Sequence, residues 1–277
     1  MSPLVVALAL SAALAHATWN AFLRSSADRL QVVMVMSLAM VPVALPFALV
    51  LPLPPMGAWP FIGLSSALQV AYSLFLVAAY RHGDLGQVYP VVRGTVPVLV
   101  SLGGFLVVGQ TLSSASVAGI ALIVFGILGL TGGRGRISAV SLLWATGTGA
   151  IVAVYATVDA LGVRTAGDPL AYTAWICLLF GTLLPLAVWV ARGRLAIDLR
   201  SRETWKAAVG GFVSLAAYGL VIAAFALGPA GPVTALRETS VVFAALLGSA
   251  FLSEALSWRR LLACIAVAAG AISIGLS

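Results

Sequence analysis

Apolar stretches of roughly twenty residues follow one another along the chain, and short segments between them hold most of the charged residues. About 20 consecutive apolar residues of helix are needed to cross the hydrocarbon core of a bilayer, so each stretch predicts a membrane span. The pattern predicts ten spans, at 3–23, 31–52, 59–80, 87–108, 114–131, 138–160, 170–191, 205–226, 232–252 and 259–276. The connections are too short for a soluble domain. We therefore predict an all-α integral membrane protein.

The composition excludes several other classes of protein. The 277 residues are 62% hydrophobic and 8% charged, against about 25% charged residues in soluble proteins. The net charge of +7 is spread over short loops, which is typical of membrane topology rather than of nucleic-acid binding. Two cysteines in apolar runs and two histidines offer no spacing for metal ligands, so we expect no metal and no cofactor. We find no catalytic motif and do not expect an enzyme.

The two halves of the chain, 1–134 and 135–277, resemble each other. WPFIGLSSALQVAY at 59–72 aligns with WKAAVGGFVSLAAY at 205–218, and the segment from Arg93 aligns with the segment from Arg237. With one inserted residue, the alignment also pairs Asn20 with Asp159, Arg24 with Arg164 and Asp28 with Asp168. A five-helix unit reverses direction across the membrane, so the second unit is inverted. Inverted repeats are typical of secondary transporters, which bind substrate between the halves. We predict two inverted five-helix repeats around a central cavity.

Basic residues mark one side of the membrane. Arg164 lies in an even-numbered loop, whereas the odd-numbered loops carry Arg24, Arg29, Arg81, Arg134, Arg136, Arg192, Arg194, Arg200, Arg202, Lys206, Arg259 and Arg260. Positive charge stays in the cytoplasm, so we predict cytoplasmic odd-numbered loops and two outward-facing termini. The preference for arginine over lysine is typical of GC-rich bacteria, which indicates the bacterial inner membrane.

Several motifs are similar to those of a known family. HATWN (16–20), YPVVRG (89–94), YATVDALGVR (155–164) and ALRETS (235–240) stand inside the repeats, and the fourth span of each repeat ends GQTLS or SEALS. The whole chain resembles the EamA-like branch of the drug/metabolite transporter superfamily. The resemblance implies a helical basket that gives alternating access by rocking of its halves. It implies no particular substrate, because that superfamily moves amino acids, drugs, sugar phosphates and nucleotide sugars.

Polar residues inside the spans are the candidate substrate-binding residues. A charge at the bilayer centre costs about 2.5–3.5 kcal/mol, so such residues usually face a cavity or a partner. The candidates are His16, Trp19, Asn20, Tyr72, Tyr89, Arg93, Tyr155, Asp159, Tyr218, Arg237 and Glu238. The first three share one helix face, and Tyr155 with Asp159 forms an equivalent stripe on the sixth span. We expect the stripes to face each other across a cavity. The alternative is that they join helices by hydrogen bonds.

Arg93 and Arg237 each lie about 9 Å inside a span, at 1.5 Å per residue. Each could reach back to the membrane interface, or neutralise a carboxylate, such as Arg93 with Asp159 or Glu238. A third interpretation is that they contact an anionic group of the substrate, which a guanidinium suits.

These residues favour a secondary transporter for a small anionic or zwitterionic metabolite, such as an amino acid or an aminophosphonate. Two alternatives stay open: a proton-coupled exporter of lipophilic cations, and a lipid flippase subunit. Asp159 and Glu238 are the proton-coupling candidates, because burial favours the protonated form of a carboxylate. The expected partners are a small solute and the bilayer, with no nucleic acid, in a monomer or a homodimer.

Overall fold

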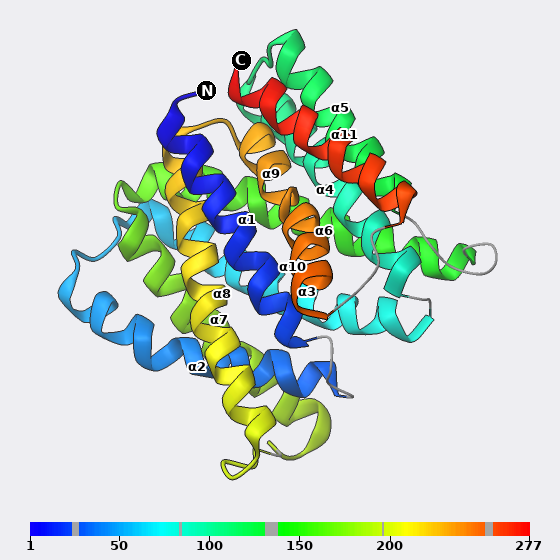
Figure 1. Cartoon of the computed structure of the whole chain (residues 1–277). Helices are drawn as coiled ribbons and strands as arrows, with labels where there is room; N and C mark the ends of the chain where they lie inside the picture. Colours follow the sequence, from blue (N-terminus) through cyan, green and yellow to red (C-terminus); the bar gives the residue numbers. More distant parts are fainter. Residues whose placement is uncertain (24–27, 83–84, 131–137, 196, 253–256) are drawn as a thin grey trace.

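Helices make up nearly all of the chain in a computed structural model, which describes residues 1–23, 28–82, 85–130, 138–195, 197–252 and 257–277 (Figure 1). No strand occurs among these residues. The helices are α1 (Pro3–Leu23), α2 (Arg29–Val50), α3 (Trp59–His82), α4 (Leu85–Val108), α5 (Ser114–Gly129), α6 (Ala139–Ala166), α7 (Pro169–Arg192), α8 (Arg202–Leu227), α9 (Ala230–Glu238), α10 (Ser240–Leu252) and α11 (Trp258–Gly275), with a 3-10 turn η1 (Met56–Ala58) before α3.

The helices match the predicted spans closely. Within the described residues, 7 helices are long and apolar enough to cross a membrane. The remaining three spans correspond to α1, to α5, and to α9 and α10 taken together. Large apolar side chains are exposed along these helices, as expected where helices face lipid rather than water. The chain is a multi-pass membrane protein.

The packing of the helices follows the repeat. Helix α3 packs against α6, and its counterpart α8 packs against α1. Likewise α4 packs against α6, and the α9–α10 pair packs against α1. The equivalent helices α2 and α7 pack on each other, and so do α5 and α11. Exchanging the two halves therefore maps these pairs of helices onto one another, as expected for two inverted five-helix repeats.

Matched residues of the two repeats begin equivalent helices. Asp28 caps α2 by accepting a hydrogen bond from a backbone N–H of the first turn, and Asp168 caps α7 in the same way. Ser113 caps α5 as Ser257 caps α11. Side-chain oxygens at these positions satisfy backbone donors that a helix start leaves free. The repeated polar residues at these loops are thus explained by helix capping.

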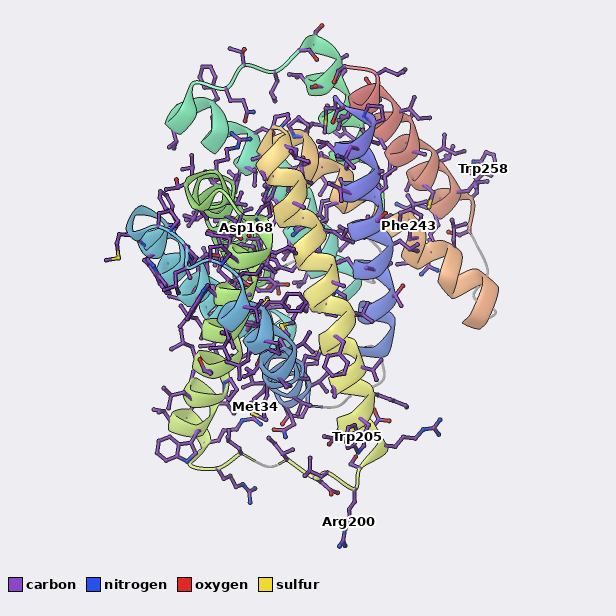
Figure 2. All side chains as sticks on the ribbon, turned by 90° about the vertical axis from the view of Figure 1, so that its left-hand side faces the viewer. Met34, Asp168, Arg200, Trp205, Phe243 and Trp258 are labelled. Atoms are coloured by element: carbon purple, nitrogen blue, oxygen red, sulfur yellow. The ribbon has the colours of Figure 1, made fainter. Side chains whose placement is uncertain are left out.

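Tryptophans mark the starts of several helices. The indole N–H of Trp59 donates to the Pro54 carbonyl at 3.2 Å, and its repeat equivalent Trp205 donates to the Leu199 carbonyl at 2.9 Å. Trp205 and Trp258 point away from the bundle (Figure 2). Tryptophan is enriched at membrane–water interfaces, where its ring is apolar and its N–H is polar. These residues fit an interfacial position at the helix ends.

Two arginines that the sequence placed in loops lie in the last turns of α6 and α7 and take different roles. Arg192, at the end of α7, forms an ion pair with Asp28 at 2.7 Å and so joins the two repeats. Hydrogen bonding from Arg192 lowers the pKa of the Asp28 carboxyl. Arg164 donates to the carbonyls of Phe225 and Gly228 at the end of α8, where a cation is favourable. Arg24, Arg134 and Arg136 lie outside the described residues, as does the side chain of Arg81.

The ninth predicted span is broken. Helix α9 ends at Glu238, Thr239 follows, and α10 begins at Ser240. The backbone N–H and the hydroxyl of Thr239 both bond to the Leu236 carbonyl, at 3.1 and 2.6 Å. Proline alone does not break a helix here, since Pro90 and Pro97 lie inside a continuous α4. The break falls directly after Glu238, at the level of the buried charges.

Close packing of α8 on α2 depends on Gly211. A Cβ atom added there would lie 2.4 Å from the Met36 carbonyl oxygen, so Gly211→Ala forces the helices apart. We expect a loss of roughly 1–3 kcal/mol, the usual cost of overpacking, measured as a lower melting temperature in detergent. Gly210→Ala is the matched control, since its Cβ would meet only the Met36 side chain at 3.6 Å. Equal melting temperatures of the two variants would contradict the prediction.

Candidate functional site

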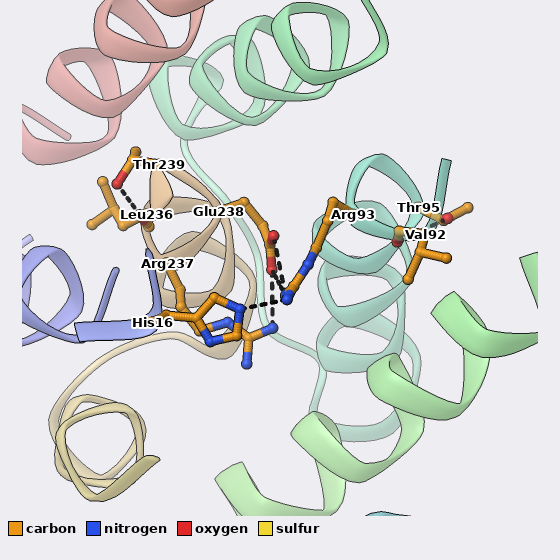
Figure 3. A network of polar contacts seen from close by, with 8 residues as sticks. All are labelled: His16, Val92, Arg93, Thr95, Leu236, Arg237, Glu238 and Thr239. Carbon is orange, nitrogen blue, oxygen red and sulfur yellow. Dashed lines mark hydrogen bonds and ion pairs between the residues drawn. The ribbon is translucent and has the colours of Figure 1, made fainter. Parts of the chain in front are cut away.

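Two buried arginines share one carboxylate in the interior. Arg93 on α4 and Arg237 on α9 both contact Glu238 (Figure 3). The Arg237 Nη2 to Glu238 Oε1 distance is 2.9 Å, and Arg93 Nη1 lies 3.4 and 3.5 Å from the two carboxylate oxygens. The exposed fractions of the three residues are 5%, 9% and 0%. Since α4 belongs to the first repeat and α9 to the second, the contact joins the two halves.

His16 on α1 completes this group. Nη2 of Arg93 contacts Nε2 of His16 (Figure 3). A guanidinium can only donate, so the imidazole accepts at Nε2 and is neutral. We call His16, Arg93, Arg237 and Glu238 the arginine cluster. With a neutral imidazole, two guanidiniums face one carboxylate among the described residues, which leaves these four side chains with a surplus of one positive charge.

Polar atoms without hydrogen-bond partners occur on α1 and α9, which carry three members of the arginine cluster, and at the start of α10. Nε of Arg237, Oγ1 of Thr234, Oγ of Ser240 and Nε1 of Trp19 are buried and make no hydrogen bond in the described structure. Trp19 packs edge-on against His16, with ring centroids 4.8 Å apart. Thr234 lies one helical turn before Glu238 on the same face. Buried polar atoms are normally bonded, and all four atoms can donate. This set suits an oxygen-rich anion.

A second group surrounds Asp159 on α6. The fully buried carboxylate accepts hydrogen bonds from the Tyr172 hydroxyl at 3.2 Å and the Tyr218 hydroxyl at 2.8 Å. Gln69 on α3 donates to the Tyr218 hydroxyl at 3.2 Å. We call Gln69, Asp159, Tyr172 and Tyr218 the aspartate cluster. Among the described residues, no basic side chain lies within ion-pair distance of Asp159.

Aromatic residues lie beside the two clusters. Tyr155 is one turn before Asp159 on α6 and packs edge-on against Tyr72 on α3, with centroids 6.1 Å apart. Tyr72, Tyr155 and Tyr218 contact other helices and still keep partial solvent exposure. Partial exposure is expected of side chains that border a water-filled space between helices. The central cavity itself, and the stripes of the first and sixth spans facing each other across it, stay predictions.

The predicted site residues fall into two groups in the structure. It brings His16, Arg93, Arg237 and Glu238 together, with Trp19 beside them, and it places Asp159 with Tyr218 in a second group. The side chains of Asn20 and Tyr89 lie outside the described residues. Of the two proposed carboxylate partners of Arg93, Glu238 is the one in contact.

Sequence reasoning missed Tyr172, Thr234 and Ser240. Tyr172 occupies an apolar run of α7, and its repeat equivalent is an apolar valine, Val32. A single polar atom in an apolar helix was the only signal available. Within the described residues, no group of three His, Cys, Asp or Glu side chains is placed to hold a metal ion.

Comparisons with known proteins agree on the family and the fold. A profile of the EamA-like transporter family matches the chain twice, over residues 3–132 and 139–276. A solved structure described only as "Crystal structure of protein" superposes with a TM-score of 0.77 at 20% identity, covering 99% of this chain and 96% of that one. At that identity the likeness shows the fold alone. No curated protein matches the sequence.

Proposed function

The chain belongs to the EamA-like transporter family, and on that premise we propose that it is a secondary active transporter for a small anionic or zwitterionic metabolite, such as an amino acid or an aminophosphonate. One observation carries the proposal: the arginine cluster holds two buried guanidiniums against one carboxylate, next to unpartnered donors. Carboxylates and phosphonates offer the acceptor oxygens and the negative charge that such a site lacks.

The placement of the site fits alternating access. Substrate sites of inverted-repeat transporters lie near the bilayer midplane, between the repeats and beside broken helices. The arginine cluster lies between α1 and α4 of one repeat and α9 of the other, and the break at Thr239 follows Glu238 directly. We propose the bacterial inner membrane as the location, with both termini outside, because basic residues gather at the odd-numbered loops.

A screen of the purified protein tests this proposal. The panel contains amino acids, aminophosphonates, phosphorylated small molecules, choline-like cations and lipophilic dyes, and the readout is the melting temperature in detergent. We expect carboxylates or phosphonates to raise the melting temperature, because a ligand that binds only the folded state stabilises it. Uptake of the best ligand into proteoliposomes then tests transport. Stabilisation by cations alone would contradict the proposal.

A second function is favoured by a specific observation. Asp159 is a buried carboxylate with no basic partner among the described residues, as a proton-coupled exporter of lipophilic cations needs. Protons and a cationic dye would then compete for Asp159, so acid pH would weaken dye binding. The arginine cluster argues against this function, since its surplus positive charge repels cations.

A further inference from the structure

We infer that the substrate is a zwitterion, with its anionic group at the arginine cluster and its ammonium group at the aspartate cluster. The inference rests on the proposed function, because it takes the anion site as given. It adds a binding site for a cationic group, formed by Asp159 together with tyrosine side chains.

Asp159 is a buried carboxylate without a cationic partner among the described residues. Buried carboxylates are normally paired with a cation, because leaving water is costly for a charge. The two phenol hydroxyls that contact Asp159 hold its oxygens in place, but they bring no positive charge. An ammonium group would supply it.

Aromatic side chains surround Asp159. Tyr218 is partly exposed and stands between Asp159 and Gln69. Tyr155, one helical turn before Asp159 on α6, and Tyr72 on α3, which packs against Tyr155, add two more partly exposed rings. Aromatic faces attract organic cations, and a nearby carboxylate fixes their position. The aspartate cluster thus has the components of an ammonium site, and Tyr218 is its partly exposed member.

The helices that carry the two clusters pack against each other. Helix α4, which carries Arg93, and helix α9, which carries Arg237, both contact helix α6, which carries Asp159. Tyr155 and Asp159 are four residues apart on α6, which is about 6 Å along the helix axis. The two clusters thus lie on helices in direct contact, and we take one small molecule to span them.

The charges of the two clusters match the two charges of a zwitterion. Among the described residues the arginine cluster has a surplus of one positive charge, and Asp159, when it is ionised, adds one negative charge without a close basic partner. A zwitterion supplies the matching charge to each cluster and leaves their sum unchanged. A simple anion would neutralise the arginine cluster and leave Asp159 without a cation. A simple cation would pair with Asp159 and leave the arginine cluster with its surplus charge.

Matched ligands on the wild-type protein give the first test. The set is alanine with propionate and ethylamine, phenylalanine with hydrocinnamate and phenethylamine, and aminoethylphosphonate with ethylphosphonate. We expect at least one amino-bearing acid to bind about tenfold or more tightly than its deaminated analogue, since a charge-assisted hydrogen bond is lost. Binding is measured by melting temperature and by competition with a radiolabelled ligand. Equal affinities within every set would overturn the inference while leaving the proposed anion transporter intact.

Variants then assign the preference to Asp159. In Asp159→Asn we expect the amino-bearing acid to bind about tenfold or more weakly, and its deaminated analogue to bind as in the wild type. Asp159→Glu keeps the carboxylate and should keep part of the preference. Asp168→Asn is the matched control, because asparagine caps a helix as well as aspartate does.

The outcomes separate this inference from the proposed function. If Asp159→Asn weakens both ligands equally, or neither, Asp159 does not hold the ammonium group and the inference is wrong. If no acid binds at all, with or without an amino group, the proposed anion transporter fails as well. An unchanged preference combined with a lost response to a pH gradient would make Asp159 a proton site instead.

Discussion

Arg93→Gln is expected to abolish binding of the anionic ligand that stabilises the wild-type protein best. Arg93 lies 3.4 and 3.5 Å from the oxygens of Glu238, while Arg237 holds the same carboxylate at 2.9 Å. Charge-assisted bonds are usually about 2.7–2.9 Å long, so the Arg93 contact is the weaker one. An incoming oxyanion can replace it more easily, which makes Arg93 the main ligand for the anion.

The expected loss of affinity is large. Removing one partner of a buried charge pair costs about 2–5 kcal/mol or more in binding, which is roughly a 30-fold to several-thousand-fold change. Equilibrium binding of the radiolabelled ligand measures it. Arg93→Lys should give an intermediate affinity, because lysine keeps the charge and loses the planar fork.

A surface arginine provides the control. Arg192→Gln removes a guanidinium from a partly exposed ion pair with Asp28, and it should leave ligand affinity unchanged. If Arg93→Gln binds the anion as tightly as the wild type does, Arg93 serves the fold alone and the proposed substrate class is wrong.

Periodicity and composition predicted most of the fold because the bilayer imposes a simple rule. A span must be apolar for about 20 residues, so its limits are visible in the sequence. The repeated serines Ser113 and Ser257 act at a single helix end, because each caps the last helix of its repeat. Signals that depend on one helix and its own ends are therefore readable without a structure.

Less could be inferred from the sequence about which charged residues pair with each other. The sequence left open whether Arg93 would meet Asp159 or Glu238, because periodicity places a residue on a helix face without saying which helix lies opposite. Neighbours such as Arg237 and Glu238 point in different directions on a regular helix, yet their side chains meet here. Contacts across helices and the break at Thr239 depend on how the two repeats dock.

Within the arginine cluster, substitution of Glu238 is expected to cause the largest change in stability. Glu238→Gln should lower the free energy of unfolding by about 3–5 kcal/mol, because it leaves two buried guanidiniums without their shared carboxylate. The readout is the melting temperature in detergent. Glu203→Gln is the matched control, since Glu203 pairs with Lys206 on the surface and such pairs contribute about 0–1 kcal/mol.

Removing one positive charge should reverse part of this loss. In the double variant Glu238→Gln with Arg93→Gln, Arg237 is the one guanidinium left in the cluster, so the surplus returns to one positive charge. We therefore expect a higher melting temperature than in Glu238→Gln alone, although the double variant contains one more substitution. An anionic ligand should likewise stabilise Glu238→Gln more than the wild type, because it replaces the missing carboxylate. A Glu238→Gln protein that is as stable as the wild type would show that Glu238 does not offset the buried arginines, and the charge argument for the site would fail with it.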